Sequence, residues 1–300
     1  MDYLLESDFL APPVVNVSVL CANYNNGRYL PDLIDSIHQS TVRPQELIIV
    51  DDGSTDNSIE MLESYSHIDY LKVISIPTNT GIAHALNTGL AQASCKYIMR
   101  IDADDYVDHT RIEKQFEYLE KHPEADLVGS NVTYFENGTG KLINHSNFPI
   151  GSDRIARRYL RGENGVLHGS VMILKDKLKE IGYNESLAIS VDYDLFARMI
   201  RKGFTMHNLN ESLTYVRLHK SNMAVSMAFP VIEMNFRLRD EIFNTQTTRF
   251  HLYTYYIHLH YYRKYLFEPS SLLRHLFLLI SVVFMPGKLL RRFTGWQGVP

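Results

Sequence analysis

Short apolar runs alternate with amphipathic segments along the first hundred residues. The apolar runs are rich in Val, Ile and Leu, as is typical of strands buried on both faces of a sheet. They predict strands at 14–21, 46–50, 71–76 and 97–101. Between them apolar residues recur at helical spacing, which predicts helices at 31–39, 58–64 and 82–93. Strands and helices that alternate at this spacing form right-handed βαβ units and therefore a parallel sheet.

The pattern becomes mixed after the fourth strand. It predicts a helix that starts near 109–110 and further helices at 153–160 and 191–200. It also predicts strands at 126–134, 169–174 and 213–218. Beyond Phe229-Pro230 the chain is rich in aromatic residues and reads as helical. We therefore expect an α/β domain over residues 1–229, with a Rossmann-like, mostly parallel sheet flanked by helices. A helical extension follows over residues 230–300.

Charge is distributed unevenly over the 300 residues, although the net charge is only -4. From Val231 onward there are nine Lys and Arg against four Asp and Glu, a local charge of +5 that leaves -9 on the first 230 residues. An acidic body argues against nucleic-acid binding. The basic tail favours an anionic surface as its partner. The hydrophobic content of 45% provides for a sizeable core.

Cysteine content and apolar run lengths indicate a compartment. Cys21 and Cys95 lie in apolar, strand-like segments, where a free cysteine is usually a small buried hydrophobe. The stretch from Met1 to Ala11 has three acids and no base, unlike the positive start of a secretory signal. The longest clean apolar run, 276–285, is shorter than the roughly 20 residues that a bilayer span needs. We expect a cytoplasmic protein.

Three carboxylates, Asp102, Asp104 and Asp105, follow directly after the fourth predicted strand. A parallel sheet delivers such residues to its carboxyl edge, where open α/β sheets bind ligands. Because like charges this close repel, a cation or a set of hydrogen bonds must compensate them. Oxygen ligands suit Mg²⁺ or Mn²⁺, and these ions hold phosphates. The alternative is a solvated acidic turn that caps the next helix.

Six motifs in a fixed order give this cluster a context. They are Asn23-Tyr24-Asn25, Asp51-Asp52-Gly53, Asn79 to Asn87, Asp102 to Asp105, Asp192-Tyr193-Asp194 and Tyr215 to His219. In this order the sequence resembles an inverting family 2 glycosyltransferase of the GT-A fold, from about Val14 to about Ser226. No Gly-Lys-Ser/Thr phosphate loop and no GxGxxG motif competes with this interpretation.

The resemblance implies roles for the nucleotide side of the site. Tyr24 stacks on the base, and Asp52 accepts a hydrogen bond from uracil N3. Asp104 is the direct ligand of Mn²⁺ or Mg²⁺, and Asp102 contacts the ribose or assists through water. Asp105 is expected to face the donor sugar or to cap the next helix. The residues leave TDP and GDP open as alternatives to UDP.

The resemblance also implies roles for the reacting side. Asp192 is the candidate general base, and Asp194 is the competing one. The family normally has Glu-Asp here, but this chain has Val191 before Asp192. His219 is a candidate metal or diphosphate ligand, and Arg217 a diphosphate partner through its planar guanidinium.

These assignments predict transfer of a hexose or N-acetylhexosamine, such as Glc, Gal or GlcNAc, from a UDP-sugar to a lipid-linked saccharide in O-antigen, capsule or lipopolysaccharide synthesis. Val191 suggests an alternative, a catalytically inactive protein that binds nucleotide sugars or glycans. A nucleotidyltransferase would need a phosphate loop rich in glycine and in basic residues near the first strand, which Asn23 to Gly27 does not provide.

The basic, tyrosine-rich tail is typical of segments that lie at a membrane interface. We expect peripheral association with the inner face of the cell membrane. The alternative is a helix pair packed on the catalytic domain or on a second copy in a homo-oligomer.

Overall fold

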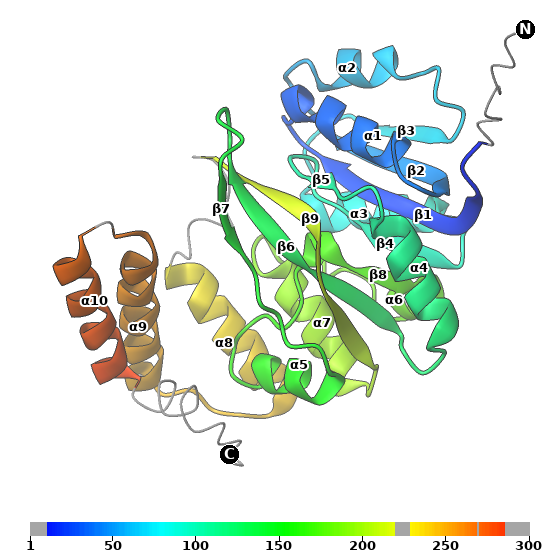
Figure 1. Cartoon of the computed structure of the whole chain (residues 1–300). Helices are drawn as coiled ribbons and strands as arrows, with labels where there is room; N and C mark the ends of the chain where they lie inside the picture. Colours follow the sequence, from blue (N-terminus) through cyan, green and yellow to red (C-terminus); the bar gives the residue numbers. More distant parts are fainter. Residues whose placement is uncertain (1–10, 220–228, 269, 286–300) are drawn as a thin grey trace, which may run out of the picture. The chain divides into compact units, whose positions relative to one another are not determined.

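The structure is a computed structural model that describes residues 11–219, 229–268 and 270–285 (Figure 1). The chain forms two compact units, Met1–Ser226 and Met227–Pro300. The domain boundary expected after residue 229 lies close to this division. The acidic N-terminal stretch and the basic residues Lys288, Arg291 and Arg292 lie outside the described residues.

The first unit is built on a sheet that has nine strands in the described part of the chain. These are β1 (Val14–Asn23), β2 (Arg43–Asp52), β3 (Leu71–Ile76), β4 (Tyr97–Arg100), β5 (Tyr106–Val107), β6 (Leu127–Glu136), β7 (Leu142–His145), β8 (Met172–Leu174) and β9 (Met206–Leu218). Their order across the sheet is β3-β2-β1-β4-β8-β6-β9-β5, and β7 pairs with β6.

Helices of the first unit connect these strands (Figure 1). They are α1 (Leu30–His38), α2 (Ser58–Ser64), α3 (Ile82–Gln92), α4 (Arg111–Lys121), α5 (Ser152–Tyr159), α6 (Lys175–Ile181) and α7 (Val191–Arg201), with short 3-10 turns at Gly27–Tyr29 and His168–Ser170. The predicted α/β class is confirmed.

Strands β3, β2, β1 and β4 run parallel, as the alternating pattern predicts. Their carboxyl ends meet at one edge, where Asn23 lies opposite Asp51 and Leu20 opposite Arg100. The other half of the sheet is mixed, because β8 runs antiparallel to both β4 and β6. Strand β9 is parallel to β6 along most of its length. Its end also pairs with β5, which follows the loop after β4, so the end of β9 lies near that loop.

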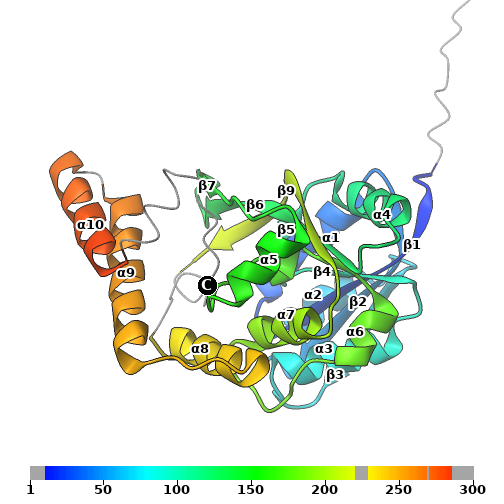
Figure 2. The same ribbon diagram turned by 90° about the horizontal axis from the view of Figure 1, so that it is seen from below.

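Alternate strand residues face opposite helical layers. Val17, Val19 and Cys21 of β1 belong to the buried core shared with α1, α2 and α4. On the other face α3 packs closely, since a Cβ on Gly89 would lie 2.4 Å from Cδ1 of Leu20. Figure 2 shows α1 and α4 on one side of the sheet and α3 on the other. Both cysteines are free and buried, as predicted.

The second unit is helical, as the sequence predicts. It comprises α8 (Phe229–Phe243), α9 (Arg249–Phe267) and α10 (Ser271–Phe284). Its small core contains Phe236 and Tyr255, and Oγ of Ser281 lies 2.9 Å from Nδ1 of His258 between α10 and α9. Among the helices within the described ranges, none has the length and apolar content that crossing a membrane requires.

Candidate active site

The loop after β1 is tied to the loop after β2. Nδ2 of Asn23 donates to Asp51 Oδ1 at 2.7 Å, and the backbone N–H of Thr55 donates to Asn25 Oδ1 at 2.7 Å. Tyr24 stands between these two contacts, and 45% of its surface is exposed. The loop therefore presents an aromatic ring at the carboxyl edge of the sheet, as the predicted stacking role requires.

Asp52 is buried and organises the start of α3. Its carboxylate accepts hydrogen bonds from the backbone N–H and hydroxyl of Thr80, at 2.9 and 2.7 Å, and from the N–H of Gly81 at 2.8 Å. An ionised carboxylate has about four acceptor positions, so these bonds leave one for a base. The sequence did not reveal this structural role, and the contact with uracil N3 stays a prediction.

Asp102 is held by a buried arginine. Nη2 of Arg100 lies 2.6 Å from Asp102 Oδ1, and the Arg100 side chain is almost fully buried whereas that of Asp102 is 38% exposed. Burial disfavours the ionised form of Asp102, but the Arg100 guanidinium outweighs it and holds the pKa of Asp102 below its usual value. Asp102 is therefore an ionised acceptor at the edge of the site.

Asp104 and His219 meet across 115 residues of sequence. Oδ2 of Asp104 lies 2.9 Å from Nε2 of His219, and both side chains are mostly buried. Burial and the neighbouring Asp102 raise the pKa of Asp104 despite the opposing contact with His219. The structure thus brings together the two residues that the sequence nominated as metal ligands.

The donor set of this pair fits a divalent cation that also binds phosphate. Within residues 11–219, 229–268 and 270–285, no group of three or more His, Cys, Asp or Glu side chains is arranged to hold a metal. Mg²⁺ and its relatives are commonly held by only one or two protein ligands, with substrate phosphates and water completing the coordination. A carboxylate and an imidazole suit that arrangement, and Mn²⁺ accepts both ligand types.

Asp105 has neither of its expected roles. It is 3% exposed, and its Oδ1 accepts the backbone N–H of Arg217 at 2.9 Å. Burial, together with the charges of Asp104 and Asp102, raises the pKa of Asp105 well above its usual value. Asp105 therefore neither faces a donor nor caps a helix, but fastens the end of β9 to the acidic loop.

Arg217 completes that fastening with its side chain. Nε donates to the carbonyl oxygen of Asp104 at 2.8 Å, Nη1 to Asn137 Oδ1 at 3.2 Å, and Nη2 to Asp32 Oδ2 at 2.5 Å. The guanidinium also lies over the Tyr29 ring, 4.7 Å from its centroid. These bonds engage three of the five guanidinium N–H groups and position the acidic loop, and the diphosphate role of Arg217 stays a prediction.

Asp192 lies in the first turn of α7, where Asn164 Nδ2 donates to its Oδ2 at 2.9 Å. Burial raises the pKa of Asp192, and the nearby charge of Asp102 adds to the effect. Asp194, by contrast, is buried in an ion pair with Arg198 at 2.5 Å. The ion pair engages Asp194 within the protein, and the assignment of Asp192 as the base stays a prediction.

The segment around His168 closes one side of the site. Nε2 of His168 lies 3.0 Å from the Tyr183 hydroxyl, and burial together with Arg100 lowers the pKa of this histidine to about 3, so the ring is neutral. The next residue approaches the acidic loop closely, because a Cβ on Gly169 would lie 2.8 Å from Asp102 Oδ2. This contact places the segment around His168 directly against the Asp102 carboxylate.

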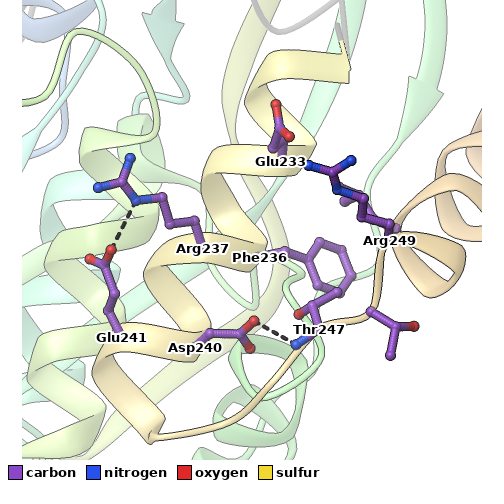
Figure 3. Close-up of a pocket in the computed structure, with 9 residues that line it drawn as sticks. Glu233, Phe236, Arg237, Asp240, Glu241, Thr247 and Arg249 are labelled. Atoms are coloured by element: carbon purple, nitrogen blue, oxygen red, sulfur yellow. Dashed lines mark hydrogen bonds and ion pairs between the residues drawn. The ribbon is translucent and has the colours of Figure 1, made fainter.

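A separate hollow of about 460 Å³ lies in the second unit (Figure 3). Its lining is strongly charged, but Arg237 pairs with Glu241 at 2.9 Å and Asp240 accepts the N–H of Thr247 at 2.7 Å. It includes none of the residues that the sequence nominated for chemistry. The carboxylates at the sheet edge therefore remain the candidate active site.

Residues 18–182 match the family described as glycosyl transferase family 2. The chain belongs to this family. Its members include an amylovoran biosynthesis glycosyltransferase, AmsE, of Erwinia amylovora, which is 31% identical over 67% of this chain and 75% of its own length. The putative glycosyltransferase EpsE of Bacillus subtilis is 32% identical over 67% of this chain and 72% of its own length.

Solved structures agree on the fold. S. aureus TarS residues 1–349 in complex with UDP-GlcNAc is similar with a TM-score of 0.62 and 17% identity, over 92% of this chain and 81% of that one. The UDP complex of the same protein has a TM-score of 0.60 at 18% identity, over 92% and 82%. The GT-A fold expected from the family 2 glycosyltransferase motifs is confirmed.

Two side chains of the site were not predicted from the sequence. Arg100 carried a weak signal, because a basic residue in an otherwise apolar, fully buried strand must have a buried partner. Asn164 carried none, since it lies in an irregular segment 28 residues before Asp192. The contact of Asn164 with Asp192 depends on chain folding that no local pattern encodes, whereas Arg100 and Asp102 are only two residues apart.

The role of Asp105 can be tested by two substitutions. Asp105→Asn keeps an oxygen that accepts the Arg217 N–H, so we expect stability within about 1 kcal/mol of the parent. Asp105→Ala leaves that N–H unpaired in a buried setting and should lower the free energy of unfolding by about 1–3 kcal/mol. Equilibrium denaturation in urea measures both, and equal losses in the two variants would contradict the tether.

Proposed function

We propose that this family 2 glycosyltransferase transfers a hexose or N-acetylhexosamine, with inversion, from a UDP-sugar to a lipid-linked saccharide during bacterial surface-polysaccharide synthesis. The observation that carries the proposal is the contact of Asp104 with His219, which assembles a phosphate-side pair beside the ionised Asp102. The names of the relatives support the pathway class, since AmsE is named for amylovoran biosynthesis. Another similar protein, 28% identical, is a poly-β-1,6-N-acetyl-D-glucosamine synthase of Staphylococcus epidermidis.

The donor in this proposal is a UDP-sugar. Structures of TarS contain UDP and UDP-GlcNAc, and this chain shares the fold of TarS. The exposed Tyr24 provides a stacking surface worth about 1–3 kcal/mol for a base, and the remaining acceptor position of Asp52 provides selectivity for uracil N3–H. The ionised carboxylate of Asp102 accepts a hydrogen bond from the ribose.

The reaction requires one proton transfer by the protein. The acceptor hydroxyl attacks the anomeric carbon from the face opposite the nucleotide, while Asp192 takes the hydroxyl proton. The bond from the anomeric carbon to the diphosphate oxygen breaks, and UDP leaves with that electron pair. Asp104 and His219 would hold a divalent cation, which would neutralise charge on the leaving diphosphate.

The site of action proposed is the inner face of the cell membrane, reached through the second unit. Leu272, Leu276, Leu279 and Val283 recur at helical spacing along α10 and are between 47% and 82% exposed. From Ser270 to the end the sequence has four basic residues and no acidic one. An apolar stripe in a basic, acid-free segment fits the interface of an anionic lipid surface.

Asp192→Asn tests catalysis. The amide cannot take a proton, so we expect kcat for transfer from the UDP-sugar to fall by about 10²- to 10⁴-fold. Binding of UDP, measured by calorimetry, should be unchanged because Asp192 lies on the acceptor side. Glu233→Gln, in the second unit, is the matched control and should keep full activity. Unchanged turnover in the Asp192 variant would contradict Asp192 as the base, whereas a parent that binds UDP but transfers no sugar would favour the binding protein suggested by Val191.

Metal dependence can be measured as ligand-induced stabilisation. A UDP-sugar with Mn²⁺ should raise the melting temperature, since a hundredfold excess over Kd adds about 2.7 kcal/mol, and EDTA should remove most of the shift. Asp104→Asn and His219→Ala should each abolish the metal-dependent part. Asp69→Asn removes an exposed carboxylate that pairs with Arg43 and serves as the control. A shift that survives EDTA and both variants contradicts the metal site.

Membrane association can be measured by co-sedimentation with vesicles of phosphatidylglycerol and phosphatidylcholine. Replacing both Leu276 and Leu279 by Ser should weaken binding at least about tenfold, because burying each leucine contributes about 1.5–3 kcal/mol. The control Leu142→Ser changes a 57% exposed leucine of β7 in the first unit and should bind like the parent. Equal vesicle binding by the parent, the double variant and Leu142→Ser would refute a lipid-binding stripe. Loss of a dimer in the double variant would also refute it, because the stripe would then be a contact between two copies.

A further inference from the structure

We propose that Asn164 is a positioning residue for the general base: its side-chain amide fixes Oδ2 of the Asp192 carboxylate and leaves Oδ1 to take the proton of the acceptor hydroxyl. This inference rests on the proposed function, because it gives Asn164 its importance only if Asp192 is the base. The residue lies in the segment after α5, outside every motif that the sequence analysis identified.

The direction of this contact is fixed by chemistry. Nδ2 of Asn164 lies 2.9 Å from Oδ2 of Asp192, and an ionised carboxylate only accepts hydrogen bonds. The amide nitrogen must therefore point at Asp192 and the amide oxygen away from it. A base whose carboxylate is held by a defined donor has one orientation rather than many, which is how an active site fixes a reacting group before the substrate arrives.

The segment that carries Asn164 is held firmly on both sides. Glu163 pairs with Arg158 of α5 at 3.0 Å. Gly165 packs so tightly that a Cβ there would lie 2.9 Å from Cγ2 of Ile155. The carbonyl oxygen of Gly165 accepts Nδ2 of Asn208 from β9 at 3.0 Å. Asn164 is therefore presented to Asp192 by a clamped backbone.

The amide oxygen of Asn164 adds nothing to stability at this position. Oδ1 of Asn164 is buried and has no hydrogen-bond partner among the residues that the structure describes. A buried acceptor without a partner costs free energy, whereas a small apolar residue would avoid that cost. Natural proteins accept such local costs mainly at functional sites. The compensating gain here is the donor directed at Asp192.

The surroundings of Asp192 determine how a change at Asn164 should appear. Asp102, in the loop after β4, faces Asp192 with like charge and raises its pKa, as burial does. The charge of Asp192 also acts on Tyr159 of α5 and on Tyr183 after α6. Both tyrosines have raised pKa values and stay neutral. The backbone N–H groups of Tyr193 and Asp192, and after them the Asn164 amide, act in the opposite direction and favour the ionised form.

The test compares Asn164→Ala and Asn164→Asp with the matched control Asn208→Ala. The control removes a side-chain amide that supports the same segment through Gly165 but does not touch Asp192. For both Asn164 variants we expect kcat for sugar transfer to fall roughly 10- to 100-fold at pH 7. The KM for the UDP-sugar should stay within threefold of the parent. Asn208→Ala should lower the melting temperature without changing the pH profile.

The pH profile separates positioning from support. Losing the Asn164 donor raises the pKa of Asp192, so the acidic limb of the kcat profile should move to higher pH in Asn164→Ala. It should move further in Asn164→Asp, which places a second carboxylate beside the base. The side chain of Asp has the same shape as that of Asn, so Asn164→Asp provides the test if Asn164→Ala does not fold.

Two results would overturn the inference. One is an acidic limb that stays in place in both Asn164 variants, and the other is an equal shift in Asn208→Ala. Failure of the proposed function looks different: the parent itself would then transfer no sugar, whereas normal turnover of Asp192→Asn would remove only the assignment of Asp192 as the base. An inactive Asp192→Asn together with unshifted Asn164 variants removes the role of Asn164 alone.

Discussion

Repulsion among three carboxylates within four residues is the constraint on which the site depends. The chain resolves it by giving each carboxylate a different environment. Asp102 has the buried guanidinium of Arg100, Asp104 has His219, and Asp105 is buried against the backbone N–H of Arg217. Because two of these partners come from the end of β9, the acidic loop keeps its shape only when the far side of the sheet is in place.

This division also separates structural from chemical roles. Asp102 keeps a low pKa and part of its surface exposed, whereas Asp105 has a raised pKa and is buried. Asp52 is likewise engaged, since three of its hydrogen bonds fasten the start of α3. Carboxylates that look equivalent in sequence thus divide into those that hold loops and those that remain available to ligands.

The parallel half of the fold could be predicted because its strands are apolar runs bounded by turn residues. Predicted and observed bounds agree for β3 and α2. Elements without such a pattern were missed: β5 has two residues, β7 is four exposed residues, and α6 is a single short helix. Their formation depends on neighbouring strands rather than on local periodicity.

The candidate site was predictable only as far as the motifs reach. The pairing of Asp104 with His219 followed from the family resemblance, and the choice of Asp192 over Asp194 as the base stays a prediction. Arg217 shows the limit of such reasoning, because a motif gives a residue type and not its partners. Its guanidinium was expected to bind phosphate, but three protein oxygens from distant segments engage it.

The position of β9 has a consequence for synthesis of the chain. Residues 18–182 carry the family match, yet Asp192, Arg217 and His219 all lie beyond them. A nascent chain that has emerged only as far as β8 has the loops after β1, β2 and β4, but it has neither Asp192 nor the residues that tether the acidic loop. Premature termination before β9 would therefore yield a fragment in which Asp104 and Asp105 lack the partners at the end of β9, so the site becomes complete only when the last strand of the sheet is made.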